Sequence, residues 1–358
     1  MSRIQEILLH DLRMPFKEPY PNAIATLTAL ETLLVIVTTD DGAVGFGEAA
    51  IVEGYTHETR QGGWNFCQHQ AQAAIGLECQ EAITRWLQHR VEHSHAVSAM
   101  VSAVEMALSH PILSAHTQTI RVPLLAPVNA KIRNLLEAEV DRLIGSGFRT
   151  LKVKVGFDVD SDLERLGWIQ SRVGDRATLR LDGNQGYRPE QALEFVKRMS
   201  AQSIELFEQP CLDADWQAAV QVARASPVPM MLDESIYGPS DIERAGQLQA
   251  AHYIKLKLVK SGGLSLLLDD LQTITKHGMK RVLGNGVASE IGCWMEACVA
   301  HASIDNAGEF NGFLKPQDSL FQDPLIFSEG SIELPKGYWP ALDMSSVKRL
   351  SVQSALFH

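Results

Sequence analysis

Two lysines, Lys152 and Lys154, lie on one side of a short apolar segment. In the sequence TLKVKVGFD, residues 150–158, they alternate with aliphatic side chains. A period of two is typical of a β-strand, in which successive side chains point to opposite faces. The two ammonium groups therefore share a face, which is either solvated or built for a reaction that uses both of them.

Polar residues recur at the ends of the apolar segments that follow this strand. Neighbouring members of the series are 24 to 28 residues apart, which is the length of one strand with one helix. In a barrel of alternating strands and helices, the active site lies at the carboxyl ends of the strands. A polar residue repeated there once per unit therefore predicts a catalytic site. The series is Lys154, Asp182, Glu208, Asp233, Lys257, Asn285 and Glu309.

Three consecutive members of the series, Asp182, Glu208 and Asp233, are carboxylates. Each alone is explained by a turn, a loop or a helix cap, but three on consecutive strand ends favour a shared role. Converging carboxylates repel one another unless a cation neutralises them. Because the set contains no Cys or His, its oxygen donors select a hard ion, Mg²⁺ first and Mn²⁺ next. Bound Mg²⁺ keeps positions open for other ligands, so we expect a small carboxylate as the substrate.

Two lysines of the series are placed to act on such a substrate. Counted from the segment RVPLLAPVNA, residues 121–130, Lys154 is on the second predicted strand and Lys257 on the sixth. They would face each other across an eight-stranded barrel, one on each side of the substrate's α-carbon. One lysine would remove the proton α to the carboxylate, the ion would stabilise the enediolate, and the other lysine would return a proton to the opposite face.

A lysine that acts as a base must be neutral, although a free lysine has a pKa near ~10.4. A second ammonium group two residues away disfavours the charged form and lowers the pKa. We therefore interpret Lys152 as the residue that lowers the pKa of Lys154. The alternative is that Lys152 extends to solvent from an exposed edge.

The composition limits the classes of partner. The chain has 358 residues and a formal net charge of -11, which repels nucleic acid and anionic membranes. It has no run of about 18 apolar residues that would span a bilayer, and its amino end lacks the apolar core of a signal peptide. Its five cysteines are scattered without a C-x-x-C pair, as is typical of reduced thiols. We predict a cytoplasmic protein with no nucleic-acid or membrane partner.

The pattern of segments divides the chain into three parts. Residues 1–121 contain a long β-branched run, a D-D-G turn, a second strand and then helix-forming segments, which predicts an α+β unit. Residues 122–325 alternate eight short apolar segments with amphipathic helices, which predicts a barrel of parallel strands. Residues 326–358 are expected to pack back on the first unit.

Taken together, the motifs resemble those of the enolase superfamily, and specifically of its muconate lactonizing enzyme subgroup. They follow the order found in the family, and the resemblance covers nearly the whole chain. It implies an α/β fold, a modified TIM barrel (β/α)7β with an N-terminal α+β capping domain, and assembly as a homo-oligomer. The matching motifs are K-x-K at Lys152, D-x-N at Asp182, E-Q-P at Glu208, D-E-S at Asp233 and K-L-V-K-S-G-G at Lys257.

The resemblance adds two residues to the predicted site. It implies that Asn184 and Glu234 orient the ligands and the lysines by hydrogen bonds. For the series itself it implies Lys154 and Lys257 as the acid and base pair, and Asp182, Glu208 and Asp233 as ligands of Mg²⁺.

The subgroup contains cycloisomerases, o-succinylbenzoate synthases, N-acylamino acid racemases and dipeptide epimerases, all of which share the two lysines. The resemblance therefore implies abstraction of the α-proton of a carboxylate and leaves the product open. We predict a racemase or epimerase of an amino-acid derivative or related carboxylate. The alternatives are a cycloisomerase or dehydratase that uses the same enediolate, and a catalytically idle member that only binds a ligand.

The family resemblance places substrate contacts at the eighth strand and in loops near the barrel mouth. Dipeptide epimerases carry D-x-D at the eighth strand to bind an α-ammonium group, whereas this chain has Glu309 and Asn311 there. One carboxylate remains instead of two, so a cationic amine would be held less strongly. The loop residues expected to close the pocket or touch the substrate are Tyr20, Tyr55, His57 and Asn285.

Lys255 departs from related sequences, which tend to have a neutral residue two positions before the catalytic lysine. It makes IKLKL, residues 254–258, a mirror of LKVKV, residues 151–155. We interpret Lys255 as lowering the pKa of Lys257, as Lys152 would do for Lys154. The alternative is a lysine that points to the solvated bottom of the barrel.

Overall fold

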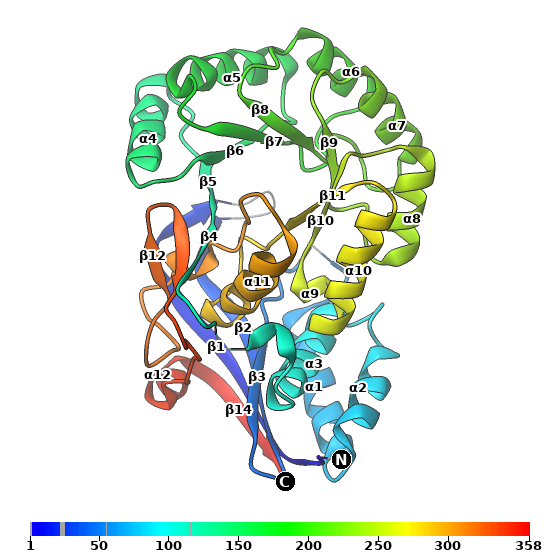
Figure 1. Cartoon of the computed structure of the whole chain (residues 1–358), viewed down its shortest axis with the longest axis vertical. Coiled ribbons are helices and arrows are strands. Elements are labelled where there is room, and N and C mark those ends of the chain that lie inside the picture. The colour runs from blue at the N-terminus through cyan, green and yellow to red at the C-terminus, as the bar shows by residue number, and fades with distance from the viewer. Residues whose placement is uncertain (1, 22–25, 55, 115) are drawn as a thin grey trace.

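The structure is a computed structural model that describes residues 2–21, 26–54, 56–114 and 116–358. Figure 1 shows two parts, one above the other. An antiparallel sheet with helices forms the lower part and contains both chain termini, while helices surround a curved sheet in the upper part. Among the described helices, none is both long and apolar enough to cross a membrane.

The antiparallel sheet has the strand order β14-β1-β2-β3. The predicted D-D-G turn joins β2 to β3, and Gly42 adopts a φ of 82° there, which glycine tolerates best. Since β14 pairs with β1, the two ends of the chain meet in one sheet. The strands are β1 (Ile4–Pro21), β2 (Thr26–Thr39), β3 (Val44–Ala49) and β14 (Ser351–Phe357).

Helices pack on this sheet and form a buried core with it. α3 is the most buried of them, and its Ala and Ser side chains allow β3 to approach closely. A Cβ atom added at Gly45 would lie 2.1 Å from the carbonyl oxygen of Ala103, so only glycine fits this position without displacement. The helices are α1 (Arg60–Ala74), α2 (Cys79–Leu87) and α3 (Ser94–Ala107).

Seven parallel strands form the curved sheet, in the order in which they follow one another along the chain. They are β5 (Leu125–Val128), β6 (Thr150–Lys154), β7 (Thr178–Asp182), β8 (Ile204–Glu208), β9 (Met230–Leu232), β10 (Tyr253–Leu256) and β11 (Lys280–Leu283). The helices that connect and follow them are α4 (Arg133–Gly145), α5 (Val159–Val173), α6 (Pro189–Arg198), α7 (Trp216–Ala225), α8 (Pro239–Leu248), α9 (Leu258–Ser261), α10 (Leu264–Lys276) and α11 (Glu290–Ser303).

The structure differs from the eight expected strands at both edges of this sheet. The segment expected as the first strand is divided into β4 (Ile120–Pro123) and β5, and only β5 joins the barrel. The segment AGEFNG forms only an isolated bridge, between Gly308 and Leu124. It still closes the ring, because Leu125 N donates to Gly308 O and Glu309 N donates to Leu283 O.

The last part of the chain contacts both the barrel connector and the antiparallel sheet. β12 (Ile326–Ser328) and β13 (Ser331–Leu334) form a small sheet with β4, in the order β12-β13-β4. After α12 (Met344–Leu350), β14 pairs with β1. The domain boundaries at residues 121 and 325 stay predictions.

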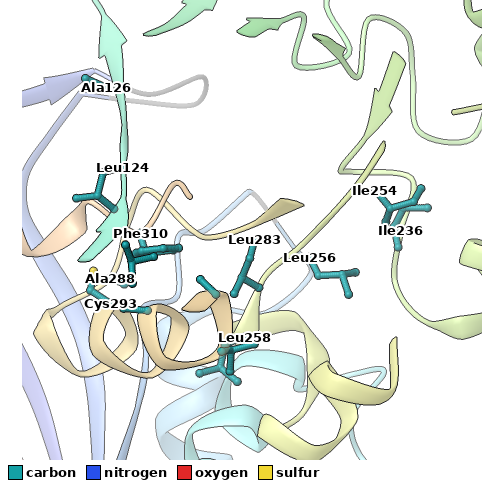
Figure 2. Close-up of a cluster of buried hydrophobic side chains, with 14 of the residues drawn as sticks. Leu124, Ala126, Ile236, Ile254, Leu256, Leu258, Leu283, Ala288, Cys293 and Phe310 are labelled. Atoms are coloured by element: carbon teal, nitrogen blue, oxygen red, sulfur yellow. The ribbon is translucent and has the colours of Figure 1, made fainter. Parts of the chain in front are cut away.

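The side chain next to Glu309 anchors the closing segment. Phe310 is fully buried and belongs to the same apolar cluster as Leu124 and Leu283 (Figure 2). Neighbouring residues of an extended segment point to opposite sides. Burial of Phe310 on one side therefore turns Glu309 toward the other side, which is the interior of the barrel.

Two buried carboxylates join the N-terminal part to the barrel. Glu48 of β3 accepts hydrogen bonds from Ser289 N at 2.8 Å and Gly292 N at 2.7 Å, at the start of α11. Glu105 of α3 accepts from Leu264 N at 2.6 Å, at the start of α10. A carboxylate at a helix N-terminus satisfies free N–H groups and the helix dipole. The N-terminal part is thereby held over the barrel.

We expect Gly45→Ala to lower the free energy of unfolding by about 1–3 kcal/mol, because the added methyl group collides with α3. Gly167→Ala in α5 is the matched control, since a Cβ there meets no atom within 4 Å. It should instead stabilise the protein by up to about 1 kcal/mol, as alanine favours helix. Urea unfolding of both variants measures the difference, and equal stability would contradict the close packing of β3 on α3.

Candidate active site

The carboxyl ends of the barrel strands surround a cavity of about 110 Å³, here called the inner cavity. A larger cavity of about 640 Å³, the outer cavity, is lined mainly by the N-terminal part of the chain. The two cavities share Val52 and Val287 in their linings. The polar side chains of the inner cavity are those of Tyr20, His95, Lys152, Lys154, Asp182, Asn184, Asp233, Glu234, Lys255, Lys257, Asn285 and Glu309.

Strand alternation and register bring the charged side chains together. On β6, Leu151 and Val153 are fully buried in the apolar core, so Lys152 and Lys154 point the other way, into the barrel. The register places Lys154 beside Asp182, and Asp182 beside Glu208. Asp233 and Lys257 directly follow β9 and β10.

Ammonium groups and carboxylates alternate around this half of the barrel. Lys154 Nζ lies 2.5 Å from Asp182 Oδ2, and Lys152 Nζ lies 2.9 Å from the same oxygen. Lys152 Nζ is also 3.0 Å from Glu208 Oε2. Glu208 is therefore the next carboxylate of the array, and it is shared with a lysine of β10.

Lys255 of β10 and Lys257, the residue directly after β10, continue the array. Lys255 Nζ lies 3.1 Å from Glu208 Oε1 and 3.4 Å from Asp233 Oδ2, while Lys257 Nζ lies 2.7 Å from Asp233 Oδ2. Glu309 closes the array, because its carboxylate pairs with Lys255 and lies 2.9 Å from Lys152 Nζ. We call these four lysines and four carboxylates the charge array.

The alternative positions considered for Lys152 and Lys255 are both wrong. Each lysine is only 3% exposed, so Lys152 does not extend to solvent and Lys255 does not point to a solvated bottom of the barrel. Both contact the carboxylates of the strand ends instead. Their proposed effects on the pKa values of Lys154 and Lys257 stay predictions.

The two buried lysines remain charged because their surroundings are anionic. Burial works to lower the pKa of Lys152, but Asp182, Glu208 and Glu309 outweigh it and raise the pKa above its usual range. Burial likewise opposes the charge of Lys255, and Glu208 and Glu309 raise its pKa well above the usual value. Lys152 is therefore a charged neighbour of Lys154. Carboxylates already balance the charge of Lys152.

The carboxylates differ in pKa because they differ in their number of cationic neighbours. Burial raises the pKa of Asp182, but Lys152 and Lys154 overcome this and lower it to about 2. For Glu208, burial and the charge of Asp182 dominate and raise the pKa to about 7. The array thus contains both a firmly ionised carboxylate and one that holds a proton more readily.

Asn184 and Glu234 connect the two sides of the inner cavity. Asn184 contacts Lys154 through its side-chain oxygen, and its Nδ2 donates to Glu234 Oε1 at 2.9 Å. The other oxygen, Glu234 Oε2, is buried and has no hydrogen-bond partner among the described residues. Because a buried polar atom without a partner is costly, this oxygen marks a position where a ligand with a donor or positive charge would fit.

The donor set of Asp182, Glu208 and Asp233 suits a hard divalent ion, since all its ligands are carboxylate oxygens. In the part of the chain that the structure describes, however, no three Asp, Glu, His or Cys side chains are grouped closely enough to hold a metal ion. The ammonium groups of Lys152 and Lys255 lie between these carboxylates. The carboxylate oxygens are donors of the type that Mg²⁺ prefers. In this structure, however, lysine ammonium groups bridge the carboxylates.

The residues expected to contact substrate are placed unequally. Tyr20 and Asn285 line the inner cavity, although the Asn285 amide already bonds to Val287. His57 is exposed and outside the cavity lining, and Tyr55 lies outside the described residues. Asn311 is also outside the lining, because its amide donates to Leu125 O at 2.9 Å and accepts from a lysine.

Burial and the nearby charge of Glu309 determine the pKa of the Tyr20 phenol. They raise the pKa of Tyr20 to about 12, so this side chain is neutral and can donate a hydrogen bond. Lys315 Nζ lies 4.5 Å from the centre of its ring and donates to Gly286 O at 2.7 Å. Lys315 thereby links Tyr20 of β1 to the loop after β11.

His95 of α3 is buried and lines the inner cavity, although its sequence context did not predict a role in the site. Glu58 orients it: Glu58 Oε2 lies 3.2 Å from His95 Nδ1 and accepts the His95 backbone N–H at 2.9 Å. No spacing in the sequence marks this histidine, since it joins the site only when α3 packs against the barrel.

Comparisons with known proteins agree with this geometry. A sequence model of the family described as "Enolase C-terminal domain-like" matches residues 135–338, more than half of the chain. The chain belongs to the enolase superfamily. It is 29% identical over 343 residues to an L-Ala-D/L-Glu epimerase of Bacillus subtilis, which covers 90% of this chain and 92% of the epimerase.

Solved structures of the superfamily share the fold. The N-succinyl Arg/Lys racemase from Bacillus cereus superposes with a TM-score of 0.90 at 21% identity, over 99% of this chain and 100% of that one. The muconate lactonizing enzyme from Pseudomonas fluorescens, complexed with muconolactone, gives 0.86 at 23% identity, over 98% and 99%. The predicted modified TIM barrel with an N-terminal capping domain, and membership of the muconate lactonizing enzyme subgroup, are confirmed.

The relatives also establish the class of enzyme. They are epimerases, racemases and muconate lactonizing enzymes, and the protein is accordingly an isomerase of the enolase superfamily. From here the N-terminal sheet with its helices is called the cap.

We expect Gly286→Ala to weaken substrate binding without loss of stability. The added Cβ would lie 3.5 Å from both Glu309 Oε1 and Tyr20 Oη, which is ordinary contact distance, yet it would occupy part of the small inner cavity. A single methyl group in a pocket changes discrimination about 10-fold or more. Steady-state kinetics should show a KM raised by about that factor, and an unchanged KM at an unchanged melting temperature would contradict the assignment of this cavity as the substrate site.

Proposed function

We propose that this protein is a Mg²⁺-dependent racemase or epimerase that exchanges the α-proton of an N-acylated amino acid or related carboxylate. One observation carries the proposal. Lys154 and Lys257, at the ends of the second and sixth barrel strands, line the same small cavity with Asp182 and Asp233. This gives the cavity one candidate base from each side.

The two lysines have matching surroundings, which supports a reversible reaction. Lys154 Nζ pairs with Asp182 at 2.5 Å, and Lys257 Nζ pairs with Asp233 at 2.7 Å. An adjacent carboxylate stabilises the ammonium form that results when a lysine takes up the α-proton. The opposite lysine donates from its ammonium form, and the two exchange roles in the reverse direction.

Asp182, Glu208 and Asp233 are the residues that would hold Mg²⁺, and Mn²⁺ has similar ligand preferences. When bound, the ion supplies positive charge beside the substrate carboxylate and stabilises the charge that develops as the α-proton leaves. Glu234 Oε2, the buried oxygen without a partner, lies in the lining of the same cavity. It is available to a donor group of the substrate.

The state of Glu309 supports a substrate whose α-nitrogen is uncharged. Glu309 pairs with both Lys152 and Lys255, and these lysines lower its pKa although burial opposes the effect. A carboxylate balanced by two ammonium groups attracts a third cation weakly. This favours an N-acylated amino acid over a dipeptide with a free α-ammonium group, and a protein of the same fold is an N-succinyl Arg/Lys racemase.

The outer cavity supports a substrate that extends beyond the α-carbon. At about 640 Å³ it is far larger than the inner cavity of about 110 Å³, and the two share Val52 and Val287. The inner cavity suits a carboxylate with its α-carbon. The outer cavity, lined by Asp11, Arg60 and other side chains of the cap, offers room for a side chain or an acyl group.

A cycloisomerase or dehydratase that uses the same enediolate is the second candidate. It is favoured by the single carboxylate at the eighth strand position, Glu309, and by the likeness to the muconate lactonizing enzyme fold. In that reaction one lysine transfers the proton and the other only balances charge.

We also propose a cytoplasmic location and a homo-oligomeric assembly. All five cysteines are buried free thiols, which suits a reducing compartment. The formal net charge of -11 supports the expectation of no nucleic-acid partner.

Proton exchange in D₂O tests the two-base proposal. We expect Lys154→Met and Lys257→Met each to lower racemisation by about 10²-fold or more, because each removes one base. Each variant should still exchange the α-proton of one enantiomer, and the two variants should retain opposite enantiomers. Nuclear magnetic resonance of N-acylated amino acids in D₂O measures both enantiomers.

The same measurement separates the alternatives. Loss of water or formation of a ring, with exchange dependent on only one lysine, would favour the cycloisomerase or dehydratase. If the unmodified protein exchanges no α-proton in N-acylated amino acids, dipeptides, betaines or lactones while Mg²⁺ is bound, it is a ligand-binding member without this activity.

A further inference from the structure

Lys255 is a member of the charge array whose ammonium group contacts more than one proposed Mg²⁺ ligand. Its ammonium group lies between two of the three proposed Mg²⁺ ligands, 3.1 Å from Glu208 Oε1 and 3.4 Å from Asp233 Oδ2. It also pairs with Glu309 of the segment that closes the ring. Lys255 is only 3% exposed, and three carboxylates surround its ammonium group. This group therefore supplies positive charge where a metal ion would otherwise supply it.

The array contains as many basic side chains as acidic ones. Its four carboxylates face four ammonium groups, each carboxylate within hydrogen-bond distance of at least one of them. A divalent cation held by Asp182, Glu208 and Asp233 adds two positive charges to a buried, balanced cluster. Repulsion between the ion and the nearest ammonium groups then opposes binding.

Lys255 has an alternative position within its reach. Glu309 is bound both by Lys255 and by Lys152, whose Nζ lies 2.9 Å from Glu309 Oε2. If the Lys255 ammonium moves off Glu208 and Asp233, it keeps Glu309 as its counter-ion. The oxygen atoms that it leaves are those that a metal ion requires.

We propose that Lys255 is a built-in competitor of the metal ion: its ammonium group neutralises Glu208 and Asp233 in the metal-free protein, and metal binding displaces it toward Glu309. The inference rests on the proposed function, because it takes Asp182, Glu208 and Asp233 as the ligands. It has two consequences. The metal-free site is stable as folded, and the affinity for Mg²⁺ is set lower than the carboxylates alone would give.

Metal binding by Lys255→Met tests the competition. Titration calorimetry with MgCl₂ should give a dissociation constant at least about 10-fold lower for the variant than for the unmodified protein. An equal or higher dissociation constant for the variant overturns the proposal. Because the titration contains no substrate, its result does not depend on turnover.

Lys315→Met is the matched control. Lys315 is also a buried lysine, but its Nζ donates to Gly286 O at 2.7 Å and to Asn311 Oδ1 at 3.0 Å, neither of which is a carboxylate. The Lys315→Met substitution removes one lysine charge from the same end of the barrel, as Lys255→Met does. It does not free a proposed Mg²⁺ ligand. We expect its dissociation constant for Mg²⁺ to change far less than that of Lys255→Met, and an equal gain in both variants would overturn the specific role of Lys255.

Thermal unfolding supplies a second measurement. In excess chelator the unmodified protein should keep nearly the melting temperature that it has in MgCl₂, because Lys255 replaces the charge of the ion. Lys255→Met should melt several degrees lower in chelator and recover in MgCl₂, since its carboxylates are then balanced only by the metal. If the variant does not fold without metal, purification in MgCl₂ followed by chelation gives the same comparison.

Failure of this inference is distinguishable from failure of the proposed function. If Lys255→Met binds Mg²⁺ no more tightly, while the unmodified protein exchanges α-protons, only the competition is wrong. The unmodified protein could instead exchange no α-protons while Lys255→Met binds Mg²⁺ more tightly. That result would support the metal site and its competitor and would contradict the assignment as a racemase.

Discussion

Four ammonium groups and four carboxylates meet at the carboxyl end of the barrel, and each has an opposite charge within hydrogen-bond distance. A single charge placed there alone would be costly, because water is largely excluded from this end. Alternation along β6 to β10 removes that cost by giving every carboxylate a cationic neighbour. The contacts within the charge array therefore hold these side chains in fixed positions.

The parallel barrel makes such an array possible. Each βα unit brings one strand end to the same rim, so side chains that are about 25 residues apart in the chain become neighbours. The pairs Lys154 with Asp182 and Asp182 with Glu208 follow directly from strand register. Two lysines on one strand then contribute at two depths: Lys154 near the mouth, and Lys152 below it against Glu208 and Glu309.

The cap also buries carboxylates, and there the balancing partners are backbone N–H groups. Its buried carboxylates, Glu48 and Glu105, accept hydrogen bonds from the free N–H groups at the starts of α11 and α10. Because these contacts tie the cap to barrel helices, Tyr20 and His95 are delivered to the inner cavity from distant parts of the chain. The barrel thus supplies the charged side chains of the inner cavity, and the cap adds Tyr20 and His95 to its lining.

Much of the site was readable from the sequence, because strand periodicity and the spacing of βα units are local properties. The period of two on residues 150–158 and the recurrence of polar residues every 24 to 28 positions predicted the barrel and its strand ends. Lys154, Asp182, Asp233 and Lys257 line the inner cavity as that pattern implies, and Glu208 ends β8 beside them. The apolar pattern of the eighth segment predicted a strand, which the structure does not form there. This segment closes the ring with a few hydrogen bonds instead.

Only the tertiary structure decided what surrounds each charge. Strand alternation by itself put Lys152 on the face of Lys154, and Lys255 on the face of Lys257. Which groups they contact was decided by packing: Lys152 pairs with Glu309, 157 residues away, and Lys255 with Glu208, 47 residues away. Likewise His95 entered the site, and Asn311 turned away from it, through the docking of α3 and the bonds of Asn311 to Leu125 and Lys315. Such contacts depend on how separate elements pack, and no periodicity within one element encodes them.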